Sequence, residues 1–225
     1  MFLVFNDYYM KFVKSLRQIR QNIGEDVKLV SVTKNRSVRE INQLLYLGVE
    51  EIGESRVQEA LRKKSLVKYD AKWHMIGHLQ RNKVKDAVKI FDMIQSLDSW
   101  KLAKKIDRES KSQGKIMGVL VQINISGEKK KHGLRKTELI TFLRKISSLK
   151  NIQVLGLMAM APHIDAEKTR PYFREMKELF DLAKEENIPG IKMKYLSMGM
   201  SNDYRVAVEE GANIVRIGRA IFGKF

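Results

Sequence analysis

The sequence feature that most constrains the fold is a regular alternation of short, apolar, β-rich runs with longer segments of helical spacing. Candidate strands lie at residues 29–33, 50–53, 73–76, 93–96, 117–124, 154–158, 195–198 and 214–217. Helical spacing is seen between them, at residues 38–47, 56–67, 82–88, 99–113, 136–149, 168–186 and 204–210, and an opening helix is expected at about residues 5–23. Strands that alternate with helices favour a parallel sheet with right-handed crossovers. Eight such units in 225 residues predict an α/β fold of the (β/α)8 TIM-barrel type with an extra N-terminal helix, and a doubly wound open sheet is the alternative.

Several element boundaries carry local signals. Ser37 stands before a helical segment with Glu40 three places on, which is the spacing of a capping box. Gly48, Gly114 and Gly211 each follow a helical segment and precede a strand, as expected where a helix ends in a left-handed residue. The local signals and the long-range alternation therefore predict the same elements.

Composition indicates the class of protein. A chain of 225 residues with 44% hydrophobic content and 3 prolines, without a Gly/Ser-rich linker, predicts a single domain over residues 1–225. The absence of cysteine excludes a disulfide framework, thiolate zinc sites and a cysteine nucleophile. Residues 1–10 lack the basic-then-apolar order of a signal peptide, and no apolar run is long enough to span a bilayer. We therefore expect a soluble, cytoplasmic protein without membrane partners.

The formal net charge of +17 raises nucleic-acid binding as a second class of function. Basic runs such as residues 62–64 and 129–131 could contact phosphate backbones. The lysines are nevertheless spread along the whole chain, and no nucleic-acid-binding signature accompanies them. We expect no specific nucleic-acid partner.

In a barrel of this kind, the residues that follow the strands converge on one face and form the functional site. The first strand leads to Lys34, whose amine can be held in place for covalent chemistry with a carbonyl compound. Turns rich in small residues follow the seventh and eighth strands, at residues 197–203 and 216–221, and each opens a helix. Backbone N–H groups at such helix starts bind anions, and barrels often bind a phosphate there. Because the first and eighth strands adjoin in a closed barrel, an amine beside a phosphate site suggests pyridoxal 5′-phosphate (PLP) as cofactor.

Six stretches of the sequence carry a resemblance to a known family. They are VSVTK at 30–34, IGESRVQE at 52–59, WHMIGHLQRNK at 73–83, GLMAM at 156–160, LSMGMSND at 196–203 and VRIGRAIFG at 215–223. In this order, they resemble the pyridoxal phosphate homeostasis proteins (YggS/PROSC family), which are single-domain relatives of the alanine racemase N-terminal barrel. The resemblance runs through nearly the whole chain.

The resemblance implies a set of cofactor-binding residues: Lys34, Ser55, His74, Met200, Ser201, Arg216, Gly218 and Arg219. By the same resemblance, Lys34 holds the cofactor covalently as a Schiff base. The side chain of Ser201, the backbone of Met200 and the amides of Gly218 and Arg219 bind the phosphate. Arg216 faces the pyridine nitrogen, and because a guanidinium keeps its proton, it disfavours a protonated ring nitrogen and weakens the cofactor as an electron sink.

The sequence departs from the family pattern at three positions. Ser55 stands where the family usually has Asn, so its contact to the cofactor ring is expected to be shorter. His78 stands where the family commonly has Pro or another small residue, and His132 where it commonly has Ser or Thr. His78, His132 and His163 lie on expected loops without recognisable ligand spacing, so no metal site is predicted. His74 lies within the third strand, either in the core or, as the resemblance implies, near the pocket.

Whether the chain is an enzyme or a carrier depends on a second acid/base. Racemisation needs such a group on the face of the substrate opposite the lysine. In alanine racemase, this group is a tyrosine supplied with the help of a separate β-domain, and this sequence is expected to lack that domain because it ends at Phe225. Tyr204 is a candidate for the role but more naturally starts the helix after the seventh strand. We therefore expect a monomeric carrier in PLP homeostasis, without catalytic residues, that delivers the cofactor to PLP-dependent apo-enzymes, and a racemase-like enzyme is the alternative.

Overall fold

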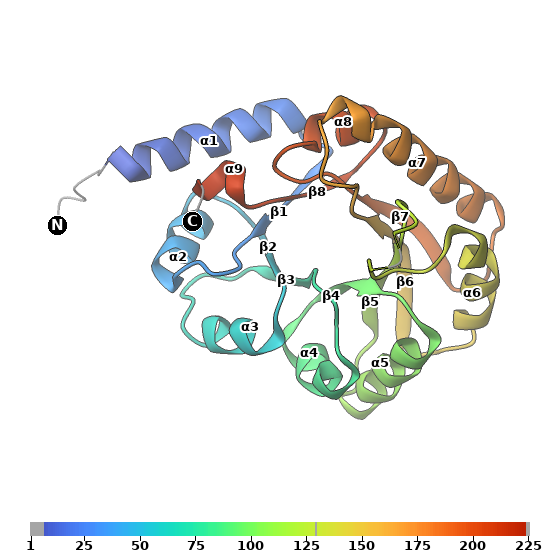
Figure 1. The fold of residues 1–225 in the computed structure, drawn as a ribbon. Helices are drawn as coiled ribbons and strands as arrows, with labels where there is room; N and C mark the ends of the chain where they lie inside the picture. The colour runs from blue at the N-terminus through green and yellow to red at the C-terminus, as the bar shows by residue number, and fades with distance from the viewer. Residues whose placement is uncertain (1–6, 129, 224–225) are drawn as a thin grey trace.

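The chain forms a closed parallel β-barrel, which Figure 1 shows along its axis. The computed structural model describes residues 7–128 and 130–223. The strands are β1 (Lys28–Val32), β2 (Glu51–Glu54), β3 (Lys72–Met75), β4 (Met93–Leu97), β5 (Met117–Ile123), β6 (Ile152–Ala159), β7 (Ile191–Ser197) and β8 (Ile214–Ile217). Each strand pairs in parallel with the next, and β8 returns to β1, where Ser31 lies opposite Ile217. The predicted (β/α)8 barrel is therefore confirmed, and the open sheet is excluded.

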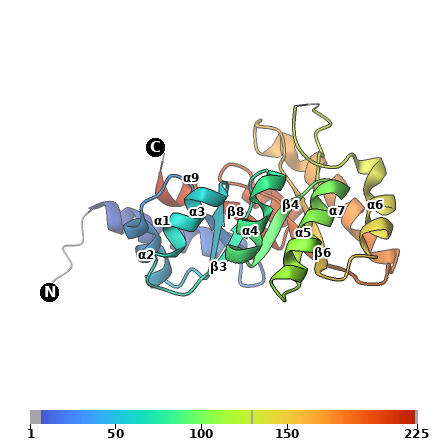
Figure 2. The ribbon, with the colours of Figure 1, turned by 90° about the horizontal axis from the view of Figure 1, so that it is seen from below.

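Helices surround the barrel on its outer side (Figures 1 and 2). They are α1 (Asp7–Ile23), α2 (Val38–Tyr46), α3 (Val57–Lys64), α4 (Val84–Ile90), α5 (Trp100–Ser112), α6 (Leu139–Ile146), α7 (Arg170–Glu185), α8 (Tyr204–Glu209) and α9 (Arg219–Phe222), with short 3₁₀ turns η1 (Arg81–Lys83), η2 (Lys136–Glu138) and η3 (Glu167–Thr169). Helix α1 precedes the barrel as predicted, and residues 5 and 6 of the expected helix lie outside the described residues. In the described part of the chain, none of the helices has the length and apolar character needed to cross a bilayer.

Local signals set most of the element boundaries. Ser37 and Glu40 form the predicted capping box at the start of α2. Gly48, Gly114 and Gly211 follow helices with φ angles of 78°, 63° and 92°, in the left-handed conformation expected of them. Helix α6, in contrast, ends at Ile146 and not at residue 149. The hydroxyls of the two serines that follow donate to carbonyls of the last turn, at 2.8 and 2.9 Å, and so compete with continuation of the helix.

Strands β6 and β7 begin earlier than their apolar runs suggest. Strand β7 starts at Ile191, four residues before the predicted start, and Ile191 pairs with Val154 of β6. The early part of β7 alternates half-buried and exposed residues, a pattern typical of a strand with one face towards solvent. Pairing with the longer β6 therefore extends a strand that local hydrophobicity alone leaves short.

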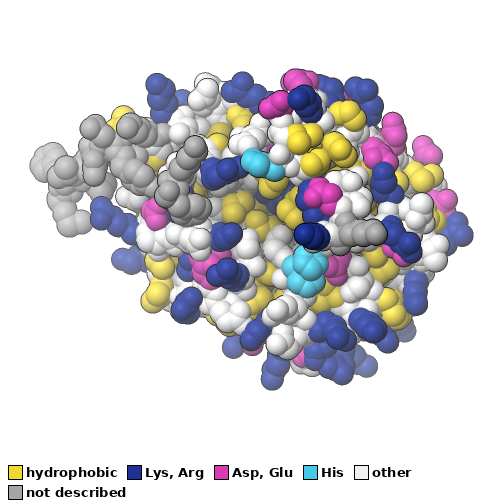
Figure 3. Space-filling model, in the orientation of Figure 1, with side chains coloured by type: hydrophobic (Ala, Val, Ile, Leu, Met, Phe, Trp, Pro, Cys, Tyr) yellow, Lys and Arg dark blue, Asp and Glu magenta, His cyan; other side chains and the backbone are white. Residues whose placement is uncertain are grey.

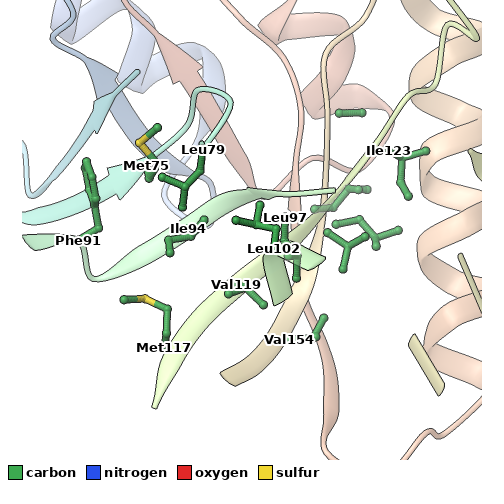
Figure 4. Close-up of a cluster of buried hydrophobic side chains, with 14 of the residues drawn as sticks. Met75, Leu79, Phe91, Ile94, Leu97, Leu102, Met117, Val119, Ile123 and Val154 are labelled. Atoms are coloured by element: carbon green, nitrogen blue, oxygen red, sulfur yellow. The ribbon is translucent and has the colours of Figure 1, made fainter. Parts of the chain in front are cut away.

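Most of the hydrophobic core lies between the strands and the outer helices. Figure 4 shows part of it, with side chains from β3, β4 and β5 packed against Leu102 of α5. Trp73, Phe91 and Phe173 are fully buried. Burial of such a side chain stabilises the fold by about 1.5–3 kcal/mol. A second cluster joins α1 to the end of the chain, where the rings of Phe12 and Phe222 lie 5.5 Å apart.

Part of the barrel interior is apolar. Val30, Leu120, Met158 and Ile214 form a small buried cluster there. Side chains alternate between the two faces of a strand, so residues two places further along point inward one layer nearer the carboxyl ends. Because the interior is filled, the loops at the carboxyl ends are the expected place for a ligand site.

Candidate functional site

Lys34 lies two residues beyond β1, on the side of the strand that faces the barrel interior. Lys34 is separated from Val30 and Val32 by an even number of residues, so it continues the same face of the strand, and its side chain is exposed. It lines a cavity of about 430 Å³ together with Ser55, Arg56, Val57, Gln58, Met75, Gly77, His78, Leu79, Gln80 and Lys83. The structure therefore brings Lys34 and Ser55 together at the mouth of one cavity.

The turn that carries Lys34 is fixed on both sides of the lysine. The Thr33 hydroxyl donates to Oε1 of Glu54 at 2.6 Å, and its carbonyl accepts from Nζ of Lys63 at 2.6 Å. Asn35 has a φ of 58°, and its amide donates to Oε1 of Glu59 at 2.7 Å. Asparagine is one of the few residues that enter this region readily. The position of the lysine is therefore set by its neighbours in the chain.

A buried ion cluster anchors this turn. Nζ of Lys63 donates to Oε1 of Glu54 at 2.7 Å and to Oε1 of Glu59 at 2.6 Å, in addition to the carbonyl of Thr33. Burial raises the pKa of Glu54, although the bonds from Lys63 and Thr33 oppose the shift. Burial also acts to raise the pKa of Glu59, but the bonds from Lys63 and Asn35 outweigh it and leave this pKa lowered.

The role of Lys63 was missed from the sequence, where it stands in the basic run 62–64. Glu59 and Lys63 are four residues apart in α3, a spacing that signals an ion pair on one helix face. The third member, Glu54, comes from β2, and only the packing of α3 on the barrel brings it close.

The turns after β7 and β8 meet at the seam of the barrel. Ser201 Oγ accepts a hydrogen bond from the amide of Ala220 at 3.1 Å, which ties the β7 turn to the start of α9. Gly218 precedes α9, and a Cβ there would lie 3.1 Å from the carbonyl oxygen of Val32 in β1. Arg219 is the first residue of α9 and is exposed. Met200, Ser201, Gly218 and Arg219 therefore lie together, next to the end of β1.

Within the β7 turn, Asp203 holds the backbone amide of Met200. This N–H donates to Oδ1 of Asp203 at 2.6 Å. Burial raises the pKa of Asp203, while the Met200 amide and the charge of Arg216 act in the opposite direction. In this structure, the Asp203 carboxylate therefore accepts the hydrogen bond of the Met200 amide, which was predicted to bind phosphate.

Arg216 is buried in the barrel interior. Its Nη1 donates to Oγ of Ser197 at 2.6 Å, and its Nη2 donates to the carbonyl of Ala159 at 2.7 Å. Burial lowers its pKa to about 10, which leaves the guanidinium charged at neutral pH. Ser197, in turn, donates to Oε1 of Gln95 at 2.7 Å.

The same chain of hydrogen bonds continues to His74, and the pair of Glu51 and Lys28 lies beyond its ring. The Oε1 atom of Gln95 accepts from Ser197, so its amide nitrogen donates to Nδ1 of His74 at 2.9 Å. Nδ1 is then unprotonated, and the ring proton lies on Nε2, 3.4 Å from Oε2 of Glu51. Oε1 of Glu51 accepts from Lys28 at 2.7 Å. Burial lowers the pKa of His74, in agreement with this neutral ring.

The hydrogen bonds from Arg216 through Ser197 and Gln95 to His74 connect β8 with β3 across the barrel interior. His74 is 3% exposed and belongs to this network; it is not among the residues that line the Lys34 cavity. Gln95 and Ser197 were missed because the sequence shows them only as polar residues in apolar strands. That mismatch is the signal that could have identified them, since a polar residue buried in a strand needs a partner.

Tyr204 begins α8, as predicted, and points away from Lys34. Its hydroxyl accepts from Nδ2 of Asn22 at 2.8 Å, and its ring packs in the cluster formed with α1. It lines a separate cavity of about 500 Å³, together with Ser201 and residues of α1. The structure therefore does not bring Tyr204 and Lys34 together.

Comparison with known proteins identifies close relatives. The sequence matches the family described as "Alanine racemase, N-terminal domain" over residues 11–224. The pyridoxal phosphate homeostasis protein of Aquifex aeolicus is 40% identical over 209 residues, which cover 91% of this chain and 90% of that protein. The protein of the same name from Pasteurella multocida is 36% identical over 231 residues, which cover 95% and 97% of the two chains.

Solved structures give the same result. PipY of Synechococcus elongatus PCC7942 with PLP bound has a TM-score of 0.88 and 33% identity, and the match covers 94% of this chain and 100% of PipY. The alanine racemase of Clostridium difficile 630 has a TM-score of 0.78 and 19% identity, covering 96% of this chain and 56% of the racemase. The racemase shares the barrel fold.

Proposed function

This chain belongs to the family of pyridoxal phosphate homeostasis proteins, and from that membership we propose that it binds PLP and holds it for delivery within the cell. The observation that carries the proposal is Lys34, an exposed amine just beyond β1 that lines a cavity together with residues that follow β2 and β3. PLP supplies an aldehyde that condenses with an amine and a phosphate that needs several donors.

The residues around Lys34 fit this cofactor. A cavity of about 430 Å³ lies within the range of small-molecule sites. A Cβ at position 218 would lie only 3.1 Å from the carbonyl oxygen of Val32 in β1. Glycine at this position therefore leaves room at the seam for backbone N–H groups to reach a ligand. Ser201, Gly218 and Arg219 lie at this seam, and Arg219 adds a positive charge. We propose that these residues and the Met200 amide bind the phosphate, the latter once Asp203 releases it.

Arg216 limits the chemistry that the protein can support. A guanidinium has five N–H donors, and Ser197 and Ala159 take two of them. We propose that a remaining donor faces the pyridine nitrogen and keeps it unprotonated, which weakens the ring as an electron sink. Ser197, Gln95 and His74 fix the orientation of this guanidinium.

We further propose that the protein acts as a carrier without turnover of its own. Racemisation needs a second acid/base opposite the lysine, and Tyr204 is engaged with Asn22 on the far side of the β7 turn. Incubation of the PLP-loaded protein with a panel of L- and D-amino acids tests this point. Product beyond that formed by free PLP would favour a racemase-like enzyme.

Binding through Lys34 is tested by absorption spectroscopy and borohydride trapping. The purified chain mixed with PLP should show a visible band that borohydride bleaches, with the reduced adduct mapped to the peptide that contains Lys34. Lys34→Ala should lose the band, whereas Lys83→Ala, which removes another amine from the same cavity, should keep it. A trappable band that persists in Lys34→Ala would disprove the assignment.

We also propose that residues 1–225 act as one domain and as a monomer that transfers PLP to apo-enzymes. Light scattering of the purified protein measures the oligomeric state. Activation of a PLP-dependent apo-enzyme by the loaded carrier, at a rate above that set by free PLP, measures delivery.

A further inference from the structure

Three loops at the carboxyl ends of neighbouring strands bring two histidines and an aspartate together. His78 follows β3, Asp98 directly follows β4, and His132 lies in the loop after β5. Nδ1 of His78 is 3.3 Å from Oδ2 of Asp98, and Nδ1 of His132 is 4.0 Å from the same oxygen. One ligand atom from each residue can be chosen so that all three lie within 4.8 Å of one another. Figure 3 shows histidine side chains exposed near the middle of this face.

The spacing of these atoms is close to that of a metal-binding set. Ligand atoms that share one zinc ion at its usual bond lengths lie roughly 3–3.6 Å apart. The His78–Asp98 distance is already in this range, whereas Nδ1 of His132 lies 4.0 Å from Oδ2 of Asp98, so His132 has to move closer before the three residues can share an ion. The two imidazole rings are stacked, with centroids 3.7 Å apart and an angle of 10° between planes. An imidazole binds a metal ion in the plane of its ring, so these two parallel rings can share one ion only after one of the side chains rotates out of the stack.

The three residues are held by their surroundings. Asp98 is mostly buried, with 12% of its side chain exposed, and it stands directly before Ser99, the N-cap of α5. The His132 carbonyl accepts from Nε2 of Gln122 in β5 at 3.0 Å. The loop of His132 returns to β5, where Leu134 N donates to the carbonyl of Gln122 at 2.8 Å. His132 is therefore presented by a loop that is pinned to the barrel.

We propose that His78, Asp98 and His132 form a binding site for a divalent transition-metal ion of the zinc type. Two imidazoles and one carboxylate suit Zn²⁺, Co²⁺, Ni²⁺ or Cu²⁺ better than Ca²⁺ or Mg²⁺, which need several oxygen ligands. Arg81 and Lys101 line the same cavity of about 610 Å³ as His78 and Asp98. The positive charges of Arg81 and Lys101 offset the negative charge of Asp98. A hard cation would therefore not be held by charge alone, and binding depends on the metal–ligand bonds.

The location gives the site a relation to Lys34. His78 lines both this cavity and the cavity of Lys34. Three protein ligands leave coordination positions open, as in catalytic zinc sites. A metal ion at this position would therefore stand at the rim of the Lys34 cavity with room for an external ligand. This proposal is independent of PLP binding.

Calorimetric titration of the protein of residues 1–225 with Zn²⁺ tests the site, and the visible bands of Co²⁺ report its coordination. We expect one ion per chain in the wild type. His78→Ala, His132→Ala and Asp98→Asn should each weaken binding by about tenfold or more. His163→Ala removes an exposed histidine outside the group and should leave the affinity unchanged. Circular dichroism of each variant verifies that it is folded.

Several results would overturn the proposal. They are the absence of stoichiometric binding, equal affinity in the ligand variants and the wild type, or a loss in His163→Ala as large as in His78→Ala. Because PLP itself chelates metals, the titration is repeated with Lys34→Ala, where the ion should still bind. Binding that disappears in Lys34→Ala would assign the metal to the cofactor and not to the histidines.

Discussion

Lys63→Met is the substitution that most directly tests how the Lys34 turn is held. Methionine keeps most of the length and volume of the lysine stem but removes the ammonium group. The change leaves Oε1 of Glu54, Oε1 of Glu59 and the carbonyl of Thr33 without their shared donor, which lies 2.6–2.7 Å from each of them. Lys63 itself is 7% exposed, so water cannot fully replace it.

The expected loss of unfolding free energy is large for a single residue of an outer helix. Removal of one partner of a buried ion pair costs about 3–5 kcal/mol, because the other charge stays buried without compensation. An exposed pair contributes about 0–1 kcal/mol. Lys168, which lies 3.2 Å from Asp165 with both side chains exposed, provides the matched control in Lys168→Met.

The deficit should depend on pH in a defined direction. The folded-state pKa of Glu54 is raised by burial, and Lys63 opposes that shift, so the variant raises this pKa further. A carboxyl with a raised folded pKa contributes stability that is present below its unfolded pKa of 4.5 and is lost as pH rises through the folded pKa. The difference between variant and wild type should therefore shrink as the pH falls and Glu54 takes up a proton.

Urea unfolding at pH 5, 6 and 7 measures both effects. The double variant Lys63→Met/Glu54→Gln should recover part of the loss, since it removes the buried charge together with its partner. A deficit below about 1 kcal/mol, equal to that of Lys168→Met, would refute the buried-cluster reasoning. A large deficit that does not change with pH would assign the loss to packing and not to the carboxylates.

Two further predictions concern the barrel interior and the β7 turn. Burial lowers the pKa of His74, so below pH 6.5 the unfolded protein binds a proton that the folded protein does not bind. The unfolding free energy of the wild type should therefore fall as pH drops below 6.5, by up to about 2 kcal/mol at pH 5. His74→Gln should flatten this slope in urea unfolding, whereas His163→Gln, at an exposed position, should not; equal slopes in all three proteins would contradict the neutral His74. Gly199→Ala should lower the unfolding free energy by about 2–4 kcal/mol, because φ is 90° and the new Cβ would lie 2.6 Å from that of Ala207. Gly114→Ala is the control, because φ is 63° and no atom lies within 4 Å of the new Cβ; it should cost about 1–2 kcal/mol from the backbone conformation alone. Equal losses of unfolding free energy at the two sites would show that the β7 turn moves to accommodate the new Cβ.

The sequence was sufficient for the fold because its signals are local and repeated. Each strand needs a short apolar run, each helix a 3.6-residue period, and these patterns are read from neighbouring residues. The capping box at Ser37 and the left-handed Gly48 are also local, and the structure has both. Two of the misplaced boundaries lie where a partner strand extends β7 and where serine hydroxyls end α6. Those effects depend on contacts that no short window of sequence contains.

The candidate site also has a part that the sequence predicts and a part that depends on tertiary contacts. The sequence by itself determined that Lys34 follows the first strand and that small-residue turns follow the seventh and eighth, because barrel topology converts order along the chain into position around a ring. Only the tertiary structure decided which polar groups meet: Lys63 with Glu54, Arg216 with Ser197, and His78 with Asp98 and His132. These partners lie on different strands, helices and loops, with no fixed spacing in the sequence. The physical reason is that charges and hydrogen-bond donors act over a few ångströms in space, and packing alone sets those distances.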